Sequence, residues 1–183
     1  ALEDLGPIFT KLGQLLATRQ DILSKEVAGP LAALCDQVRQ VDFSLLDCHL
    51  SKVYGNNWLQ QFSSFDVEPI AAASIAQVHG AKLHSGEDVV VKILRPGVRR
   101  KVTRDLALMA FCARVLGFFP RVKKRLKPVE VVAEFKLILT AELDLLREGS
   151  NMSLMASNFS NHPYMYVPKV YWPQTRSQVL VME

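Results

Sequence analysis

The chain has 183 residues, of which 49% are hydrophobic and 22% are charged, with a formal net charge of +4. This composition is ordinary for one globular domain or one large lobe, and the length allows a substantial core. No secretory signal is evident, and no apolar run reaches the roughly 18 residues that a membrane span needs. The three cysteines, Cys35, Cys48 and Cys112, match no metal-ligand spacing and favour a reducing compartment.

The first part of the chain predicts a helical section. Apolar residues recur at helical spacing over residues 2–18, which predicts an amphipathic helix. A second helix is expected over residues 24–38, and a third over residues 43–54 with Asp42 as its N-cap. A short turn around residues 57–62 closes the section.

From residue 65 the pattern becomes strand-like. Five strands are predicted, at residues 65–68, 75–83, 88–94, 165–168 and 178–182. A hairpin at Ser85-Gly86 joins the second strand to the third. Helices are predicted over residues 99–118 and from Pro128 to about residue 158, because proline suits the first turn of a helix.

Positive charge is concentrated in one section of the chain. Between Lys92 and Lys127 there are 12 basic residues and one acidic residue, Asp105. Such a field suits an anionic partner, which could be a nucleotide, a nucleic acid or an acidic membrane surface. The alternative is a solvated basic face without a partner.

Lys92 stands within an otherwise apolar strand, residues 88–94. A run of this kind is typical of a strand that is buried on both faces. A buried ammonium group needs a counter-charge, so we expect Lys92 to meet a carboxylate, a phosphate or both. The alternative is that Lys92 reaches solvent from an edge strand.

The last predicted long helix carries candidate partners for lysine. At 100° per residue, Glu142 falls near the middle of its apolar stripe, Asp144 points away and Glu148 lies on a flank. A carboxylate centred on a buried stripe also needs a counter-charge. The chain thus offers two lysines in apolar surroundings, Lys11 and Lys92, and two candidate carboxylates, Glu142 and Glu148.

Small residues at a turn precede Lys92. They are followed by a strand, a tight hairpin and the strand that carries the lysine. This layout is typical of a hairpin that covers phosphates, with a lysine reaching back to them. The residues of this segment are Ile70, Ala71, Ala72, Ala73, Ser74, Ile75, Ala76, Gln77 and Val78.

Together these motifs resemble the UbiB-type atypical kinase family, the ADCK group, along nearly the whole chain. The matching motifs are, in order, the KxGQ motif at residues 11–14, the alanine-rich loop at 71–74, the strand lysine Lys92, the ExD motif at 142–144, the helix C glutamate Glu148 and the hinge strand at 179–183.

The resemblance implies an α+β fold, a protein kinase-like N-lobe with a five-stranded antiparallel sheet and a long helix C. Residues 1–64 would form a helical KxGQ extension. Residues 65–183 would form the N-lobe and end at the hinge, so we expect an N-terminal fragment without the C-lobe.

The resemblance also implies a role for each motif. Lys92 would contact the α/β-phosphates of ATP and pair with Glu148, while backbone groups of residues 70–78 would cover the nucleotide. Glu183 and its neighbours would approach the adenine. The residues that would occlude the usual protein-substrate site are Lys11, Gln14, Glu142 and Asp144, with Lys11 meeting one of the two carboxylates.

The implied activity is that of an ATP-dependent atypical kinase or ATPase that supports ubiquinone biosynthesis. No His-x-Asp catalytic loop and no Asp-Phe-Gly-like motif is present, so the ligands of Mg²⁺ are expected in the missing C-lobe and none here. We therefore expect the fragment alone to be inactive.

The expected partners are ATP, quinone-biosynthesis proteins or lipids, and an anionic membrane surface, with no nucleic acid. The expected location is the cytoplasmic side of a bacterial inner membrane, or a mitochondrion if the source is eukaryotic. The alternatives are a non-catalytic nucleotide-binding scaffold and a lipid-surface module.

Overall fold

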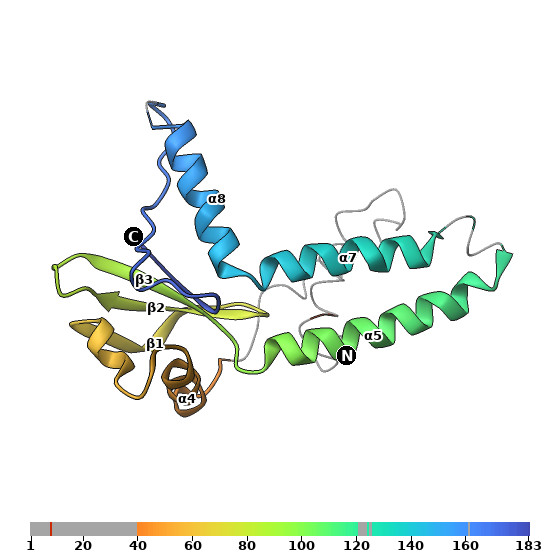
Figure 1. The fold of residues 1–183 in the computed structure, drawn as a ribbon, viewed down its shortest axis with the longest axis horizontal. Coiled ribbons are helices and arrows are strands. Elements are labelled where there is room, and N and C mark those ends of the chain that lie inside the picture. Colours follow the sequence, from red (N-terminus) through yellow and green to blue (C-terminus); the bar gives the residue numbers. More distant parts are fainter. Residues whose placement is uncertain (1–7, 9–39, 121–123, 125, 161) are drawn as a thin grey trace. The chain divides into compact units, whose positions relative to one another are not determined.

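The computed structural model describes residues 8, 40–120, 124, 126–160 and 162–183 of the chain (Figure 1). Residues 39–96 and 141–183 form one compact unit, and residues 97–140 belong to another. The predicted helices over residues 2–18 and 24–38 lie outside the described residues, as do Lys11 and Gln14. The domain boundary predicted near residue 64 stays a prediction.

The first helix of the sheet-containing unit is α4, Phe43–Tyr54, with the predicted bounds. Asp42 caps it as expected, because its Oδ1 accepts a hydrogen bond of 2.8 Å from the Ser44 N–H. Gly55 ends the helix with φ 95°, a backbone conformation that glycine adopts without strain. The 3-10 helix η2, Trp58–Gln61, occupies the predicted turn.

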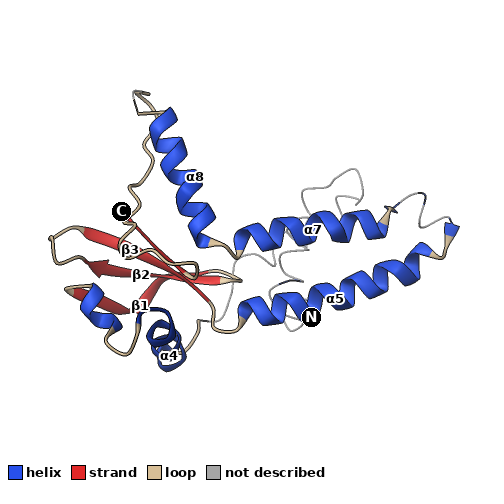
Figure 2. Ribbon diagram, viewed as in Figure 1, coloured by secondary structure: helices blue, strands red, loops and turns tan. Residues whose placement is uncertain are grey.

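Four antiparallel strands form the sheet in the order β1-β2-β3-β4 (Figure 2). Their bounds are Ser64–Ala72, Ala76–Lys82, Asp88–Leu94 and Val179–Met182. β1 extends further than predicted and includes Pro69, which an edge strand tolerates because one side of its backbone needs no partner. Gly86, with φ 99°, supplies the turn of the β2–β3 hairpin.

The fifth strand, predicted at residues 165–168, is not present. The chain instead reaches the sheet two residues later, where Val170 forms an isolated antiparallel bridge with Met182. The expectation was wrong because alternating apolar residues, including the exposed Tyr164 and Tyr166, here belong to an irregular segment. The sheet of the described residues is therefore four-stranded.

The strand register separates two faces of the sheet. Val78, Lys92 and Leu180 are paired neighbours on one face, which we call the Lys92 face. Adjacent residues point to the other face, the α4 face, where Val91 and Ile93 pack against α4. Figure 1 shows α4 and α8 on opposite sides of the sheet.

The α4 face holds the main hydrophobic core of this unit. Its largest members are completely or almost completely buried and come from α4, from η2 and the residue after it, and from β3 and β4. They are Leu46, Leu50, Trp58, Phe62, Val91, Ile93, Val179 and Val181.

The helices after the third strand differ from expectation in one respect. α5, Val98–Gly117, lies within one residue of its predicted bounds. The single helix predicted from Pro128 to about residue 158 is instead two helices, α7, Pro128–Glu142, and α8, Leu145–Asn158. Apolar periodicity continues across the break, so the pattern alone gave no sign of it. None of the helices within the described ranges is long and apolar enough to cross a membrane.

Candidate functional site

Lys92 and Glu148 meet on the Lys92 face. The ammonium Nζ of Lys92 donates hydrogen bonds to both carboxylate oxygens of Glu148, at 2.6 and 2.8 Å. The two side chains retain 26% and 35% of their exposure, so the pair is partly open to solvent. Because the ion pair is partly exposed, the ammonium group of Lys92 is accessible to an anionic ligand.

The start of α8 aims Glu148 at the sheet. Asp144 is the N-cap of the helix and its Oδ1 accepts from the N–H groups of Leu146 and Arg147, at 3.2 and 3.4 Å. Glu148 therefore lies in the first turn, where the helix dipole favours a carboxylate.

Gly149 lets α8 approach the sheet closely. A Cβ at this position would lie 3.1 Å from Leu180 Cδ1 and 3.2 Å from Trp172, closer than ordinary contacts. The glycine follows Glu148 directly, so the close approach brings the carboxylate within reach of β3. The apolar stripe calculated from the sequence includes Gly149, but the sequence did not predict this close approach to the sheet.

The position of Asp144 corrects the stripe calculated for one long helix. Glu142 is the last residue of α7 and Asp144 is the cap of α8, so they do not share a continuous helical face with Glu148. The predicted contact of Lys11 with Glu142 or Asp144 involves residues outside the described ranges and stays a prediction.

The alanine-rich segment forms a hairpin rather than an open loop. Its first residues, up to Ala72, belong to β1 and its last, from Ala76, belong to β2. The three residues between them, 73–75, are called the alanine turn below. The N–H of Ala73 donates to the Ala76 carbonyl at 2.8 Å and closes it.

Gln77 contributes no side chain to the Lys92 face. It is fully buried on the α4 face, where its Oε1 accepts from the Val41 N–H. Its Nε2 lies 3.4 Å from His79 Nε2, and His79 Nδ1 donates to the Asp66 carbonyl at 2.9 Å. Burial lowers the pKa of His79, so the imidazole is neutral in this network.

Arg95 is a residue that the sequence reading missed, since it was grouped only with the basic section. Its backbone N–H donates to the Ile75 carbonyl at 2.9 Å. Its side-chain Nε donates to the Ala73 carbonyl at 2.8 Å. Both contacts depend on tertiary structure, and burial of the guanidinium lowers its pKa.

Glu183, predicted near the adenine, follows β4. Its backbone N–H donates to the Lys169 carbonyl at 3.0 Å, and its carboxylate accepts from the Tyr166 hydroxyl. The Tyr166 hydrogen bond lowers the pKa of this carboxyl group. Within the described part of the chain, no group of three metal-ligating side chains is present.

The model of the ABC1 atypical kinase-like domain family matches residues 33–183. The protein named "Probable protein kinase UbiB" of Pseudomonas fluorescens (strain Pf0-1) is 45% identical over 183 residues. Its namesake from Pseudomonas entomophila (strain L48) is 46% identical. Both matches cover 100% of this chain and 34% of the relative, so the chain spans about a third of the length of these relatives.

A solved structure also matches, titled "The complex structure of Rv3197-erythromycin from Mycobacterium tuberculosis". It is 31% identical with a TM-score of 0.64, and the match covers 93% of this chain and 43% of that one. The predicted α+β, kinase-like N-lobe is confirmed by these matches, with four strands in the sheet.

Proposed function

Because the chain belongs to the ABC1 atypical kinase-like family, we propose that it supplies the ATP-binding lobe of an atypical kinase or ATPase. The observation that carries the proposal is the bidentate contact between Lys92 and Glu148, 2.6 and 2.8 Å long, on a sheet face left partly open. A strand lysine paired with a helix glutamate is the arrangement that kinases use to hold ATP phosphates.

In this proposal Lys92 binds the α/β-phosphates and Glu148 orients it. Val78 lies beside Lys92 on the same face and offers apolar contact to the nucleotide base, whereas Leu180 is completely buried next to Gly149. The alanine turn covers the phosphates through backbone N–H groups. Glu183 and its neighbours approach the adenine through the backbone, and Mg²⁺ would accompany ATP through ligands outside residues 1–183.

Alanine at the turn bears on the reaction type. It restricts the backbone conformations that glycine reaches freely, so this turn is stiffer than a glycine-rich one. The resemblance also implies that Lys11 and Gln14 occlude the usual protein-substrate site, so we infer ATP hydrolysis or chemistry on a small molecule or lipid. Support of ubiquinone biosynthesis is the role that the resemblance implies.

The test compares Lys92→Ala with wild type in the complete protein, by calorimetric ATP binding and by phosphate release. We expect the variant to lose ATP binding, because Lys92 supplies the cation that binds the α/β-phosphates in this proposal. Lys82→Ala is the matched control, since Lys82 forms an exposed ion pair of 3.3 Å with Asp88 at the far end of the same hairpin.

Unchanged ATP affinity in Lys92→Ala would contradict the proposal. Wild-type protein that binds ATP but never turns it over, even with quinone-pathway lipids present, would instead identify the non-catalytic scaffold.

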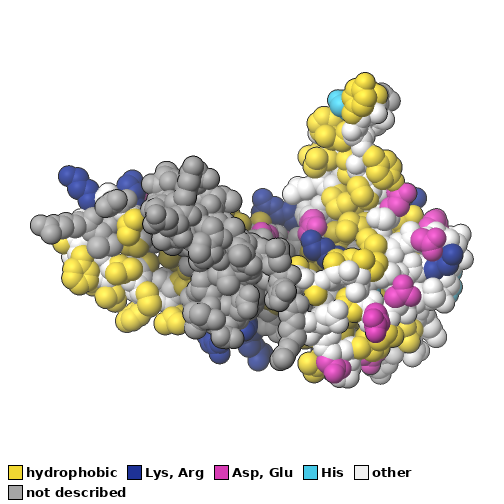
Figure 3. Space-filling view, turned by 180° about the vertical axis from the view of Figure 1, so that it is seen from behind, with side chains coloured by type: hydrophobic (Ala, Val, Ile, Leu, Met, Phe, Trp, Pro, Cys, Tyr) yellow, Lys and Arg dark blue, Asp and Glu magenta, His cyan; other side chains and the backbone are white. Residues whose placement is uncertain are grey.

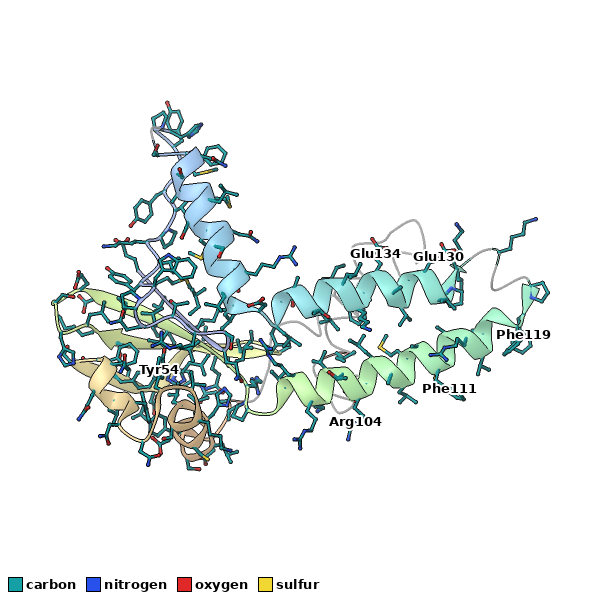
Figure 4. The ribbon with its side chains drawn as sticks, in the orientation of Figure 1. Tyr54, Arg104, Phe111, Phe119, Glu130 and Glu134 are labelled. Carbon is teal, nitrogen blue, oxygen red and sulfur yellow. The ribbon has the colours of Figure 1, made fainter. Side chains whose placement is uncertain are left out.

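A stripe of exposed side chains along α5 favours a second role, in binding an anionic membrane surface. Leu108, Phe111, Val115 and Phe118 follow one another at helical spacing and are 57%, 62%, 42% and 82% exposed. Arg104 lies on the same side of the helix as Phe111 (Figure 4). Hydrophobic side chains gather along the lower left edge of this unit in the view of Figure 3.

Basic residues beside exposed aromatic side chains suit the boundary between anionic headgroups and acyl chains. We propose that this stripe rests on the cytoplasmic face of the inner membrane. Wild-type protein should co-sediment with anionic vesicles but not with neutral ones, and added salt should release it. Binding of Phe111→Ser that equals that of wild type would rule the stripe out.

A further inference from the structure

The alanine turn is hydrogen-bonded to Arg95, the residue that follows β3. Arg95 uses its backbone N–H for the Ile75 carbonyl and its side-chain Nε–H for the Ala73 carbonyl, at 2.9 and 2.8 Å. Arg95, the residue after β3, thus donates hydrogen bonds to two of the three carbonyl groups of this turn.

Engaging the carbonyl groups fixes which way the peptide groups face. A peptide whose carbonyl is bound beneath the turn directs its N–H group to the other side. Within the described ranges neither the N–H nor the hydroxyl of Ser74 donates a hydrogen bond. Both donors are therefore available to a ligand at the alanine turn. Successive N–H groups at a turn are the donors that bind phosphate.

Arg95 is also fixed relative to Lys92, which lies three residues earlier on β3. Leu94 donates its N–H to the Gln178 carbonyl at 3.0 Å, and this bond ties the end of β3 to the chain that enters β4. Lys92 lies on β3, and the turn is hydrogen-bonded to Arg95 directly after β3. Movement of the turn relative to Lys92 is therefore restricted.

We propose that Arg95 is a positioning residue, which holds the alanine turn at a fixed distance from Lys92 so that its N–H groups meet the nucleotide phosphates. This role rests on the proposed ATP binding. It assigns to Arg95 an effect on binding of the phosphate chain rather than of the nucleoside, because its hydrogen bonds to Ala73 and Ile75 act on the turn.

The first experiment measures nucleotide affinity in the complete protein. Arg95→Met keeps an unbranched side chain of similar length but has no N–H donor for the Ala73 carbonyl. We expect ATP and ADP to bind roughly tenfold more weakly, the effect of one charge-assisted hydrogen bond. Adenosine affinity should change less than twofold. Lys82→Gln, which removes a cation from the other end of the hairpin, should change neither.

Equal losses for ATP and adenosine would overturn the proposal, because they indicate general damage to the cleft. Unchanged ATP affinity in Arg95→Met would overturn it too, while leaving the proposed function intact.

The second experiment needs no nucleotide. Hydrogen exchange at the amides of residues 73–76 should be faster in Arg95→Met than in wild type, with exchange in β3 and β4 unchanged. If wild type fails to bind ATP, the proposed function is wrong, and this measurement still decides the contact. Equal exchange rates in the two proteins would show that Arg95 does not hold the turn.

Discussion

The two faces of the sheet are covered in different ways. On the α4 face, Leu46 and Leu50 are completely buried against strands whose inward side chains are also apolar. On the Lys92 face, α8 makes its closest approach through a glycine, and the ion pair beside it stays about one-quarter to one-third exposed. One face excludes water and the other admits it.

This difference indicates that stability and ligand binding are located on separate faces. Apolar burial contributes about 25 cal/mol per Å² removed from water, so the α4 face dominates folding. A partly exposed ion pair contributes little to folding but is accessible to a charged ligand. Substitutions on the two faces should therefore affect different measurements.

Leu50→Ala on the α4 face is the substitution expected to have the largest effect, and that effect should be on stability alone. Leu50 is completely buried, and removing its side chain should lower the free energy of unfolding by about 2–5 kcal/mol. Urea unfolding of the complete protein measures the loss. Leu45→Ala on the same helix is the control, since Leu45 is 59% exposed and should change stability by less than about 0.5 kcal/mol. A large loss of ATP affinity in folded Leu50→Ala would show that the faces are coupled.

The pH dependence of stability tests the polar part of the α4 face. Burial holds the pKa of His79 below the ordinary 6.5, so the unfolded state binds a proton more readily than the folded state. Stability contributed by His79 is therefore complete above pH 6.5 and declines as the pH falls toward the lowered value. A proton on Nε2 would also face the Gln77 amide donor, 3.4 Å away.

Urea midpoints at pH 7.5, 6.5 and 5.5 measure this decline. His79→Phe keeps a ring stacked on Phe65, with the native centroids 5.2 Å apart, but cannot titrate. The variant should be less stable at pH 7.5, because Asp66 and Gln77 lose a partner, yet lose less stability on acidification. His49, whose pKa burial also lowers, accounts for a remaining slope. An unchanged slope in His79→Phe would exclude His79 as the cause.

The sequence predicted the strands and helix ends that local residue patterns determine. Apolar alternation placed the inner strands within two residues of their bounds, and Asp42 marked the start of α4. The break between α7 and α8 was missed because Leu145 and Leu146 continue the apolar period. Asp144 is the N-cap of α8, a role that the motif interpretation of residues 142–144 did not include.

The site was predictable where a charge demanded a partner. The apolar surroundings of Lys92 required a carboxylate or a phosphate, and the family resemblance pointed to Glu148. Arg95 and Gly149 gave no comparable signal, because their contacts join segments that are distant in sequence. The Ala73 carbonyl precedes Arg95 by 22 residues, and Leu180 follows Gly149 by 31.

Gly149→Ala tests whether ligand binding on the Lys92 face requires the close approach of α8 to the sheet. The added methyl group gains about 1 kcal/mol of helix propensity but meets Leu180 and Trp172 at 3.1 and 3.2 Å, and overpacking costs about 1–3 kcal/mol. We expect a net loss of roughly 1 kcal/mol and weaker ATP binding, because α8 must move away with Glu148. Ser150→Ala, one position further on the exposed side, should leave ATP affinity unchanged. Wild-type affinity in Gly149→Ala would show that α8 need not approach so closely.

Glu148→Gln has the smallest expected effect on folding and separates the two faces most clearly. The amide keeps the shape of the carboxylate and one acceptor for Lys92, and the lost charge interaction is screened because both side chains are partly exposed. Unfolding free energy should change by less than about 1 kcal/mol. ATP affinity should fall by about tenfold, since the neutral amide orients Lys92 less firmly. Asp88→Asn removes the same charge from the exposed pair with Lys82 and should alter neither quantity. A stability loss as large as that of Leu50→Ala would mean that the ion pair belongs to the core, and the two faces could then no longer be assigned separate tasks.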